Sequence, residues 1–289
     1  MDKNESEKQK IAEEFTSFLK LEDLVKEKKP VSKVGLMRIV EAHVQTVPYQ
    51  SYSHAMRNTI KDMMVLDWQH LKEVIIDKRM GGMCYMISEF ANIGLRSLGY
   101  DAHACRSRVL LGKPYDATLP YTHDILFVFL DGKQYLVDVG FGYNSLREPF
   151  EFDPSKEVQT YNIQDIETYQ IRRFPEEGGN FYYILYMMIK DEWTTFYMFH
   201  NECMKDNEPQ EEYRDFLKAG NSYLINNVFK GGILVNKGRI CFQYMDKTFT
   251  RNEFHNGKKT VGIVYDDPNK FVSDVQAICN IKIDLSILP

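Results

Sequence analysis

Hydrophobic positions in the first hundred residues repeat at helical spacing. Between Ser32 and Val47 apolar side chains recur every three or four residues, and Pro48 ends the pattern. A second run of this kind begins near Cys84 and stops at Gly99, a residue type that often follows a helix in left-handed conformation. The pattern therefore predicts two helices, with Cys84 at or near the amino terminus of the second.

From Asp101 to about His200 the pattern changes to aromatic and β-branched runs separated by turns. The segments HDILFVFL, KQYLVDVG and FYYILYMMI are typical of strands and predict an antiparallel sheet or barrel. A polar stretch after His200 indicates a boundary or an excursion rather than a strand. Two more strands, GGILVN and GRICFQYM, and a helix near residues 269–279 are predicted to follow.

Composition places the chain among ordered globular proteins, with 289 residues, 44% of them hydrophobic and 27% charged. The net charge of -5 and the pI near 5.9 provide no basic surface for nucleic acid. The densely charged amino terminus lacks the apolar centre of a secretory signal, and no apolar stretch is long enough to span a bilayer. We therefore expect a cytoplasmic protein without membrane or nucleic-acid partners, and its oligomeric state is left open.

Five scattered cysteines include no C-x-x-C pair, so no metal site is expected. Cys84 directly follows the sequence RMGGM at the predicted helix start. Two glycines allow a sharp turn and a close approach to a ligand, and the N–H groups of a helix start stabilise a thiolate. Cys84 is thus a candidate nucleophile, although a buried structural cysteine is the alternative. The other four are expected to be structural thiols: Cys105, Cys203, Cys241 and Cys279.

A predicted hairpin carries two further candidates. Its strands run from His123 to Leu130 and from Lys133 to Gly140 around an Asp-Gly dipeptide, which favours a two-residue turn. If Leu130 pairs with Lys133, His123 and Asp138 share one face with backbones roughly 7–8 Å apart. A carboxylate on one imidazole nitrogen would leave the other nitrogen for a cysteine thiolate. A three-residue loop would reverse this parity, and His123 capping a strand with Asp138 in solvent is the alternative.

Three blocks of the chain resemble, in order, the catalytic blocks of the arylamine N-acetyltransferases. They are the R-x-G-G-x-C segment ending at Cys84, Thr122-His123 ahead of a strand, and VDVGFG around Asp138. His123 follows Cys84 by 39 residues and Asp138 follows His123 by 15, spacings similar to those of the family. A fourth stretch, residues 36–49, resembles the family's amino-terminal helix and P-F-E-N segment. The resemblance is strong over roughly the first half and otherwise lies in the order of elements.

The family resemblance implies an α+β fold: a helical bundle, an antiparallel β-barrel and an α/β lid, with a papain-like Cys-His-Asp site. The implied domains are residues 1–99 with the nucleophile, 100–205 with the histidine and aspartate, and 206–289 as the lid. Cys84 would accept acetyl from acetyl-CoA, His123 would act as its base, and Asp138 would orient the imidazole. The implied reaction is a ping-pong transfer to an aromatic amine or hydrazine, as in xenobiotic metabolism, with acetyl-CoA as co-substrate and no metal.

Binding residues follow from the same resemblance. Family positions that contact CoA correspond here to Leu119, Pro120, Gly140, Phe141, Gly142, Tyr223 and Asn226, and acceptor-pocket positions correspond to Thr122 and Tyr49. Around Tyr223 the family's S-P-x-S-like pattern is replaced by LINNV.

Two residues depart from the family pattern beside the nucleophile. Met80 stands where the family usually has arginine, with Arg79 displaced by one, and Gln50 replaces the glutamate of P-F-E-N. We expect Gln50 and Met80 to form a neutral substitute for an ion pair, because losing only one charged partner would leave a costly buried charge.

Two other classes of function stay open. Papain-like peptidases and transglutaminases share the Cys, His, Asp order, and a binding protein that lost turnover could keep the same fold. His43 is expected to be a hydrogen-bonded core residue, and the aromatic run at residues 181–186 is expected to lie in barrel strands.

Overall fold

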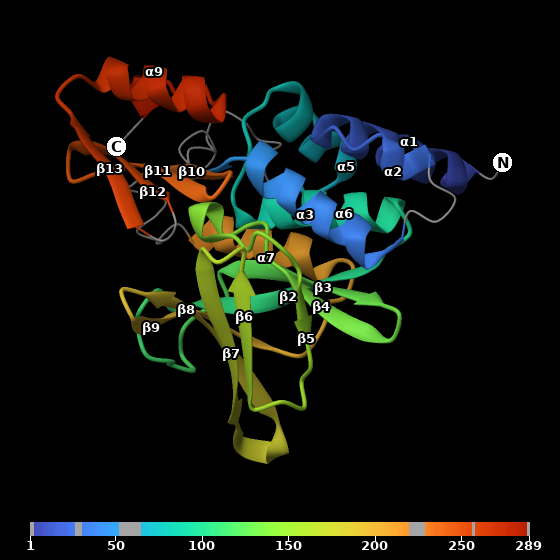
Figure 1. The fold of residues 1–289 in the computed structure, drawn as a ribbon. Helices are drawn as coiled ribbons and strands as arrows, with labels where there is room; N and C mark the ends of the chain where they lie inside the picture. The colour runs from blue at the N-terminus through green and yellow to red at the C-terminus, as the bar shows by residue number, and fades with distance from the viewer. Residues whose placement is uncertain (1–2, 27–30, 52–64, 220–228, 256–257, 288–289) are drawn as a thin grey trace.

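The computed structural model describes residues 3–26, 31–51, 65–219, 229–255 and 258–287. Helices come first, an eight-stranded sheet follows, and a second sheet with one long helix comes last (Figure 1). The helices and the second sheet lie side by side over one end of the eight-stranded sheet (Figure 1). In these ranges no helix is both long and apolar enough to cross a membrane.

The amino-terminal part is helical, as predicted. Helix α3 begins after Ser32, whose hydroxyl accepts the N–H of Gly35 at 3.0 Å, and it ends shortly before Pro48. Helix α6 begins at Cys84 and is followed by Gly99, which has a φ of +93°. The helical elements are α1 (Lys3–Leu19), α2 (Asp23–Lys26), α3 (Lys33–Thr46), α5 (Trp68–Leu71), η3 (Lys72–Asp77) and α6 (Cys84–Ser97).

The middle part is an antiparallel sheet in the order β5-β4-β3-β2-β9-β8-β7-β6. Its two edge strands approach each other, because the Tyr161 hydroxyl donates to the Glu151 carbonyl at 2.8 Å and the Tyr161 ring stacks on Phe150. The sheet is therefore a nearly closed barrel, as predicted, with an aromatic interior. Its strands are β2 (Asp101–Val109), β3 (His123–Leu130), β4 (Lys133–Val137), β5 (Phe150–Phe152), β6 (Val158–Ile163), β7 (Glu167–Pro175), β8 (Phe181–Ile189) and β9 (Glu192–His200), with the short helices η4 (Gly142–Asn144) and η5 (Glu177–Gly179) between them.

The carboxyl-terminal part begins with a helix in the polar stretch after His200. A five-stranded antiparallel sheet follows, in the order β1-β10-β11-β12-β13. Phe271 and Val275 of α9 pack onto one face of this sheet. The elements are α7 (Glu208–Ala219), β10 (Phe229–Val235), β11 (Gly238–Met245), β12 (Thr248–His255), β13 (Lys258–Tyr265), α9 (Pro268–Cys279) and η6 (Leu285–Ile287).

One strand joins the first and last parts of the chain. Strand β1 (Tyr49–Gln50) follows helix α3 in sequence but pairs with β10, so that Tyr49 lies opposite Gly232. The helical part thus contributes an edge strand to the carboxyl-terminal sheet. The division into three domains at residues 99/100 and 205/206 stays a prediction.

Candidate active site

The glycine turn before Cys84 packs against the segment that ends at β1. Gly81 has a φ of +63°, and a Cβ on this residue would lie 1.9 Å from the Pro48 carbonyl oxygen. Gly82 donates its N–H to that same oxygen at 3.2 Å, and Gln50 donates to the Gly82 carbonyl at 2.9 Å. Only glycine fits at position 81, which explains the sharp turn that puts Cys84 at the first residue of α6.

Cys84 is buried, with 7% of its surface exposed, and its Sγ donates to the Thr122 carbonyl at 3.5 Å. Burial raises the pKa of this thiol, and the carboxylates of Asp124 and Asp138 raise it further, while backbone N–H groups at the helix start lower it. The low thiol pKa expected from the helix start is therefore not found, because burial outweighs the N–H groups. With its pKa raised, Cys84 needs a base beside it for ionisation.

The predicted hairpin is confirmed in its register. Leu130 lies opposite Lys133, and the two turn residues Asp131 and Gly132 have φ values of 52° and 73°, as a two-residue primed turn requires. Strand β4 ends at Val137, three residues earlier than the predicted Gly140. The chain leaves the sheet after Val137 because the next carbonyl, that of Asp138, accepts the N–H of Leu146 at 2.8 Å.

His123 and Asp138 meet across this hairpin. The ring Nε2 of His123 lies 3.1 Å from both carboxylate oxygens of Asp138, and Gly140 donates its N–H to one of them at 3.1 Å. Both side chains are almost fully buried. The other ring nitrogen, Nδ1, is also buried and has no hydrogen-bond partner among the described residues. His123 therefore has one nitrogen held by a carboxylate and one available for proton transfer.

Gly140 brings the hairpin close to the nucleophile. A Cβ at this position would lie 2.5 Å from the Ser88 hydroxyl and 3.0 Å from the Cys84 carbonyl oxygen. Any larger residue would separate strand β4 from helix α6, and with it Asp138 from the start of that helix.

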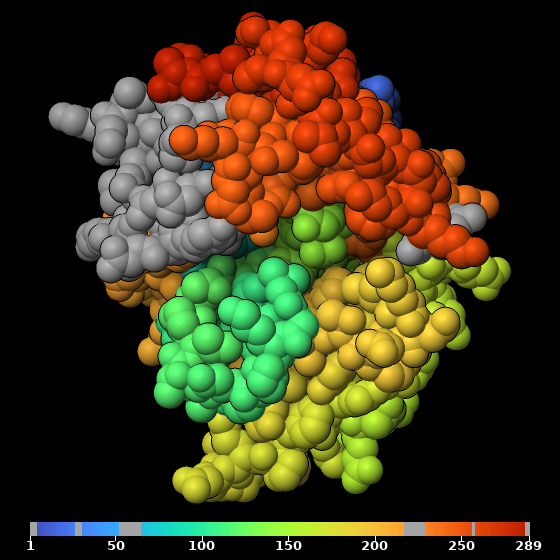
Figure 2. Space-filling view, turned by 90° about the vertical axis from the view of Figure 1, so that its left-hand side faces the viewer, coloured from blue at the N-terminus to red at the C-terminus, as the bar shows by residue number. Residues whose placement is uncertain are grey.

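A cavity of about 180 Å³ opens beside Cys84 and His123. It lies where the barrel meets the carboxyl-terminal sheet, and Figure 2 shows a hollow between these two parts, the barrel in green and yellow and the second sheet in orange to red. Five other predicted residues line the cavity: Tyr49, Thr122, Gly140, Phe141 and Gly142. Sequence reasoning missed seven more: Met83, Val109, Leu111, Tyr143, Asn144, Phe216 and Lys230.

Other predicted contacts lie elsewhere. Leu119 packs with Leu110, Ile184 and Met198 on the barrel, and neither it nor Pro120 is among the described residues that line the cavity. Tyr223 and Asn226 lie outside the described residues.

Two expectations about individual residues are corrected. His43 is fully buried as predicted, but neither ring nitrogen has a hydrogen-bond partner within the described ranges, since its ring packs against Phe15 and Phe90. Cys203 is exposed rather than buried, whereas the cysteines at positions 105, 241 and 279 are buried thiols. The aromatic run at residues 181–186 lies in barrel strand β8, as predicted.

Gln50 and Met80, the two residues that depart from the family pattern, are each placed by the structure. Gln50 is fully buried, and Met80 packs between the helical core and the core of the carboxyl-terminal sheet. Arg79 lies over the Phe18 ring at 4.6 Å and is exposed. A neutral contact between Gln50 and Met80 stays a prediction.

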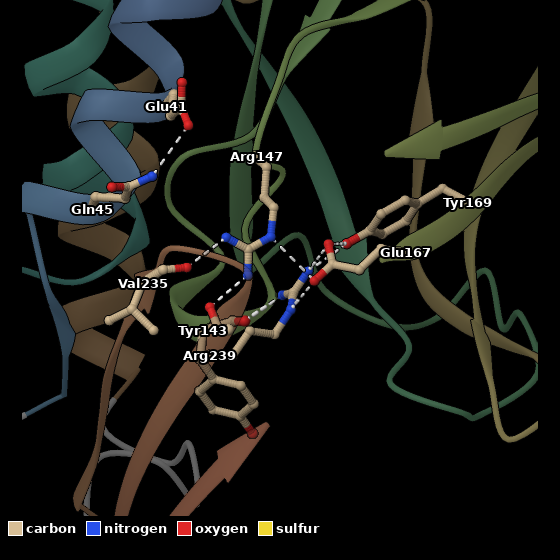
Figure 3. A network of polar contacts seen from close by, with 9 residues as sticks. Glu41, Gln45, Tyr143, Arg147, Glu167, Tyr169, Val235 and Arg239 are labelled. Atoms are coloured by element: carbon tan, nitrogen blue, oxygen red, sulfur yellow. Dashed lines mark hydrogen bonds and ion pairs between the residues drawn. The ribbon is translucent and has the colours of Figure 1, made fainter. Parts of the chain in front are cut away.

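A buried ionic network joins the barrel to the second sheet (Figure 3). Glu167 of β7 binds the guanidinium groups of Arg239 and Arg147, and it accepts the Tyr169 hydroxyl at 2.8 Å. Arg239 also donates to the carbonyl of Tyr143, a cavity residue. Burial acts to raise the pKa of Glu167, but the two guanidinium groups outweigh it and hold that pKa below its usual range.

Arg147 links this network to the second sheet. It donates to the Val235 carbonyl at 2.9 Å (Figure 3). It also donates to the Gly238 carbonyl at 2.5 Å. The network therefore fastens strands β10 and β11 to the barrel next to the cavity.

Enzymes that carry an acyl group on a cysteine use a cysteine, a histidine and an aspartate in the active site. This structure has the same three residue types, all buried, next to a cavity. The family model that matches the chain agrees with this class. The chain belongs to the N-acetyltransferase family, whose model matches residues 35–287.

Curated relatives and solved structures lead to the same family. An arylamine N-acetyltransferase of Mycolicibacterium smegmatis is 29% identical over 58% of this chain and 58% of its own length. An arylamine N-acetyltransferase / N-hydroxyarylamine O-acetyltransferase of Salmonella typhimurium is 28% identical over 55% of this chain, which is 51% of its own length. The chain thus spans just over half the length of these relatives.

Similarity of fold extends further. An arylamine N-acetyltransferase structure from Mycobacterium smegmatis has a TM-score of 0.75 at 22% identity, covering 94% of this chain and 92% of that one. The Mycobacterium marinum arylamine N-acetyltransferase in complex with CoA has a TM-score of 0.70 at 21% identity, covering 86% and 88%. At these identities the likeness shows the fold.

Proposed function

We propose that the protein is an arylamine N-acetyltransferase that transfers acetyl from acetyl-CoA to an aromatic amine or hydrazine through acetyl-Cys84. The observation that carries this proposal is the state of His123, a residue of the cavity that Cys84 also lines. Its Nε2 is held by Asp138, and its buried Nδ1 has no hydrogen-bond partner among the described residues. The names of the curated relatives support the same activity.

In the first half-reaction the Cys84 thiol gives its proton to His123 Nδ1. The thiolate sulfur attacks the thioester carbonyl of acetyl-CoA, and collapse of the tetrahedral adduct breaks the bond to the CoA sulfur. The leaving thiolate takes the proton from the imidazolium, so that free CoA and acetyl-Cys84 are formed. The raised pKa of Cys84 supports this order, because the thiol ionises only as the base accepts its proton.

In the second half-reaction the amine attacks the acetyl-Cys84 carbonyl and gives a proton to His123. The C–S bond breaks, the Cys84 sulfur regains that proton, and the acetylated amine leaves. Asp138 keeps the imidazole in one orientation and balances its positive charge in both steps. The tetrahedral adduct carries a negative charge on the former carbonyl oxygen. We assign the backbone N–H groups at the start of α6 as the donors that stabilise this oxygen.

Binding roles follow from the cavity lining. We assign Tyr49, Thr122, Phe141 and the glycines at 140 and 142 to the pocket that holds the acetyl group and the acceptor ring. The CoA roles of Leu119, Pro120, Tyr223 and Asn226 rest on the family resemblance alone.

A reducing compartment suits this chemistry. All five cysteines are free thiols, including Cys84 and the exposed Cys203, which supports work in the cytoplasm, where thiols stay reduced.

The decisive experiment is intact-protein mass spectrometry after mixing with acetyl-CoA alone, followed by peptide mapping. We expect one acetyl group on Cys84 and a full loss of acetylation and turnover in Cys84→Ala. Cys203→Ala is the matched control, since it removes an exposed thiol and should leave acetylation unchanged. An acetyl group on another residue would contradict the mechanism, and no acetylation without a peptide substrate would favour a peptidase or transglutaminase.

A further inference from the structure

Two cysteines outside the catalytic cavity face each other across neighbouring segments of the chain. Cys105 belongs to β2, and Cys203 lies shortly after the end of β9. Strand β9 runs antiparallel to β2, and the chain stays beside β2 beyond that end, because the Met204 N–H donates to the Ala104 carbonyl at 2.8 Å. Cys203 precedes one partner of this hydrogen bond and Cys105 follows the other, so their backbones lie opposite each other.

The distance across such a pair suits a disulfide. Opposed residues of antiparallel chains have Cα atoms roughly 4.5–5.5 Å apart, and disulfides join Cα atoms that are about 4.4–6.8 Å apart. The Cys105 Sγ already points at the opposite segment, since it donates to the His200 carbonyl at 3.2 Å. Burial raises the pKa of Cys105, and the nearby Cys203 thiol raises it further. The two sulfurs are thus within reach of each other through rotation of their side chains.

Only one of these two thiols is open to a reagent. Cys105 is 1% exposed, whereas Cys203 is an exposed residue. Both line a cavity of about 240 Å³ that shares none of its described lining residues with the cavity beside Cys84. A reagent therefore meets Cys203 first, and Cys105 lies behind it as the thiol that can displace the reagent. An accessible thiol with a second thiol beside it is the arrangement of cysteines that respond reversibly to oxidation.

We propose that Cys203 and Cys105 form a redox-active pair that is oxidised by low-molecular-weight disulfides such as oxidised glutathione. The Cys203 thiolate attacks one glutathione sulfur, the S–S bond breaks, and the departing glutathione takes up the proton that Cys203 lost. Cys105 then attacks the Cys203 sulfur, and the second glutathione leaves with the proton of Cys105. Two protein thiols become one disulfide while one glutathione disulfide becomes two thiols. The inference is separate from acetyl transfer, which uses Cys84.

The new bond ties strand β2 to the segment that leads into α7, a helix that begins shortly after Cys203. Two aromatic residues of this helix, Tyr213 and Phe216, contact the ring of Tyr85. Tyr85 directly follows Cys84 in the sequence. Oxidation therefore fastens the helix that packs behind the nucleophile, and reducing surroundings release it again.

The test uses the full-length protein at about pH 8 with an excess of oxidised glutathione. Burial and the Asp101 carboxylate raise the pKa of Cys203, so the alkaline buffer supplies more of the attacking thiolate. Samples are quenched in acid, unfolded and alkylated, and the disulfides are mapped by mass spectrometry. We expect a bond between Cys105 and Cys203 that an excess of reduced glutathione removes. A glutathione that stays on Cys203 of the wild type, or no reaction at this thiol, would overturn the proposal.

Two variants separate the roles of the thiols. Cys203→Ser should leave Cys105 reduced, because the buried thiol then has no exposed neighbour to resolve. Cys105→Ala should stop at one glutathione on Cys203. If Cys105→Ala fails to fold, Cys203→Ser and the wild-type map still decide, and oxidation of Cys105 in Cys203→Ser would contradict the proposal.

A second pair of neighbouring thiols is the matched control. Burial raises the pKa of Cys279 and the Cys241 thiol raises it further, but each of these two residues is only 4% exposed. Without an exposed thiol, a bond between them should form at least about tenfold more slowly than the bond between Cys105 and Cys203. Equally fast oxidation of the buried pair would show that the exposed thiol does not start the reaction, and would overturn the proposal.

Discussion

At the scale of single residues, the two nitrogens of His123 have unlike surroundings. Nε2 faces both oxygens of Asp138, whereas Nδ1 is buried without a described partner. An unpaired buried nitrogen costs free energy in the resting protein. The cost is removed when this nitrogen takes the Cys84 proton. The arrangement therefore favours the His123 imidazolium that forms during acetyl transfer.

Replacing Asp138 by Asn tests this arrangement. The amide cannot balance an imidazolium and can hold the ring in the wrong tautomer, so we expect Cys84 acetylation to slow by about 10³–10⁴-fold with the fold intact. The measurement is single-turnover acetylation beside a thermal unfolding curve. Asp131→Asn at the hairpin tip is the control, because Asn tolerates the positive φ of that position. Near wild-type acetylation in a folded Asp138→Asn protein would remove the aspartate from the mechanism.

His43 predicts a dependence of stability on pH. Burial lowers its pKa from 6.5 to about 3, so between these values the unfolded chain binds a proton that the folded protein does not. Stability should therefore fall as the pH drops below 6.5, by about 1.4 kcal/mol per pH unit for this group.

His43→Leu should remove that part of the slope and leave the protein at least as stable at pH 7, because neither ring nitrogen has a hydrogen-bond partner in the described part of the chain. Denaturant unfolding at several pH values measures the effect. His255→Leu, at an exposed position of β12, should keep the wild-type slope. An unchanged slope in His43→Leu would show that another group causes the acid sensitivity.

At the scale of elements, the segment around β1 and the glycine turn form one unit. Their backbones exchange hydrogen bonds at Pro48, Gln50 and Gly82. Because Met80 lies between two apolar cores, a charge introduced at this position would enter an apolar environment. Gln50 is buried as well.

Met80→Arg alone should destabilise the protein by roughly 3–5 kcal/mol, because the new charge lacks a partner. Adding Gln50→Glu should recover much of the loss if the two side chains are neighbours. Thermal unfolding of the two single variants and the double variant measures the coupling in a double-mutant cycle. Additive effects would show that the two departures from the family pattern are independent.

The Glu167 network is the corresponding unit between the barrel and the second sheet. The pKa of Glu167 lies below 4.5 in the folded protein. The stability that its carboxylate contributes is therefore present above pH 4.5 and is lost as the pH falls through the pKa of the folded state. Glu167→Gln leaves two buried guanidinium groups without a counter-charge and should cost roughly 3–5 kcal/mol at pH 7.

The difference in unfolding free energy between wild type and Glu167→Gln should shrink as the pH falls below 4.5, because the unfolded wild-type chain then binds a proton at Glu167 that the folded protein does not yet bind. Denaturant unfolding at pH 7 and at pH 4 measures it. Glu177→Gln, in the exposed turn after β7, is the control and should match the wild type at both values. A constant difference across this range would show that ionisation of Glu167 does not hold the sheet.

At the scale of the whole molecule, local features were predictable and distant ones were not. The hairpin register follows from one dipeptide, and the start of α6 follows from two glycines and a periodic run. The cavity wall combines Val109, Phe216 and Lys230 with residues near Tyr49, and no spacing along the chain links these positions. Burial of Cys84 likewise depends on the packing of several elements, which is why the low pKa expected from the helix start was wrong.

The pairing of β1 with β10 has a consequence for synthesis on the ribosome. Cys84 and its glycine turn leave the ribosome long before residues 229–235, yet the segment that braces the turn gains its strand partner only when β10 arrives. Loops that close so late tend to slow folding and leave early parts exposed. A nascent chain halted before β10 should therefore contain all three residues of the candidate triad but hold the nucleophile loop loosely, so that catalytic competence comes only near the end of translation.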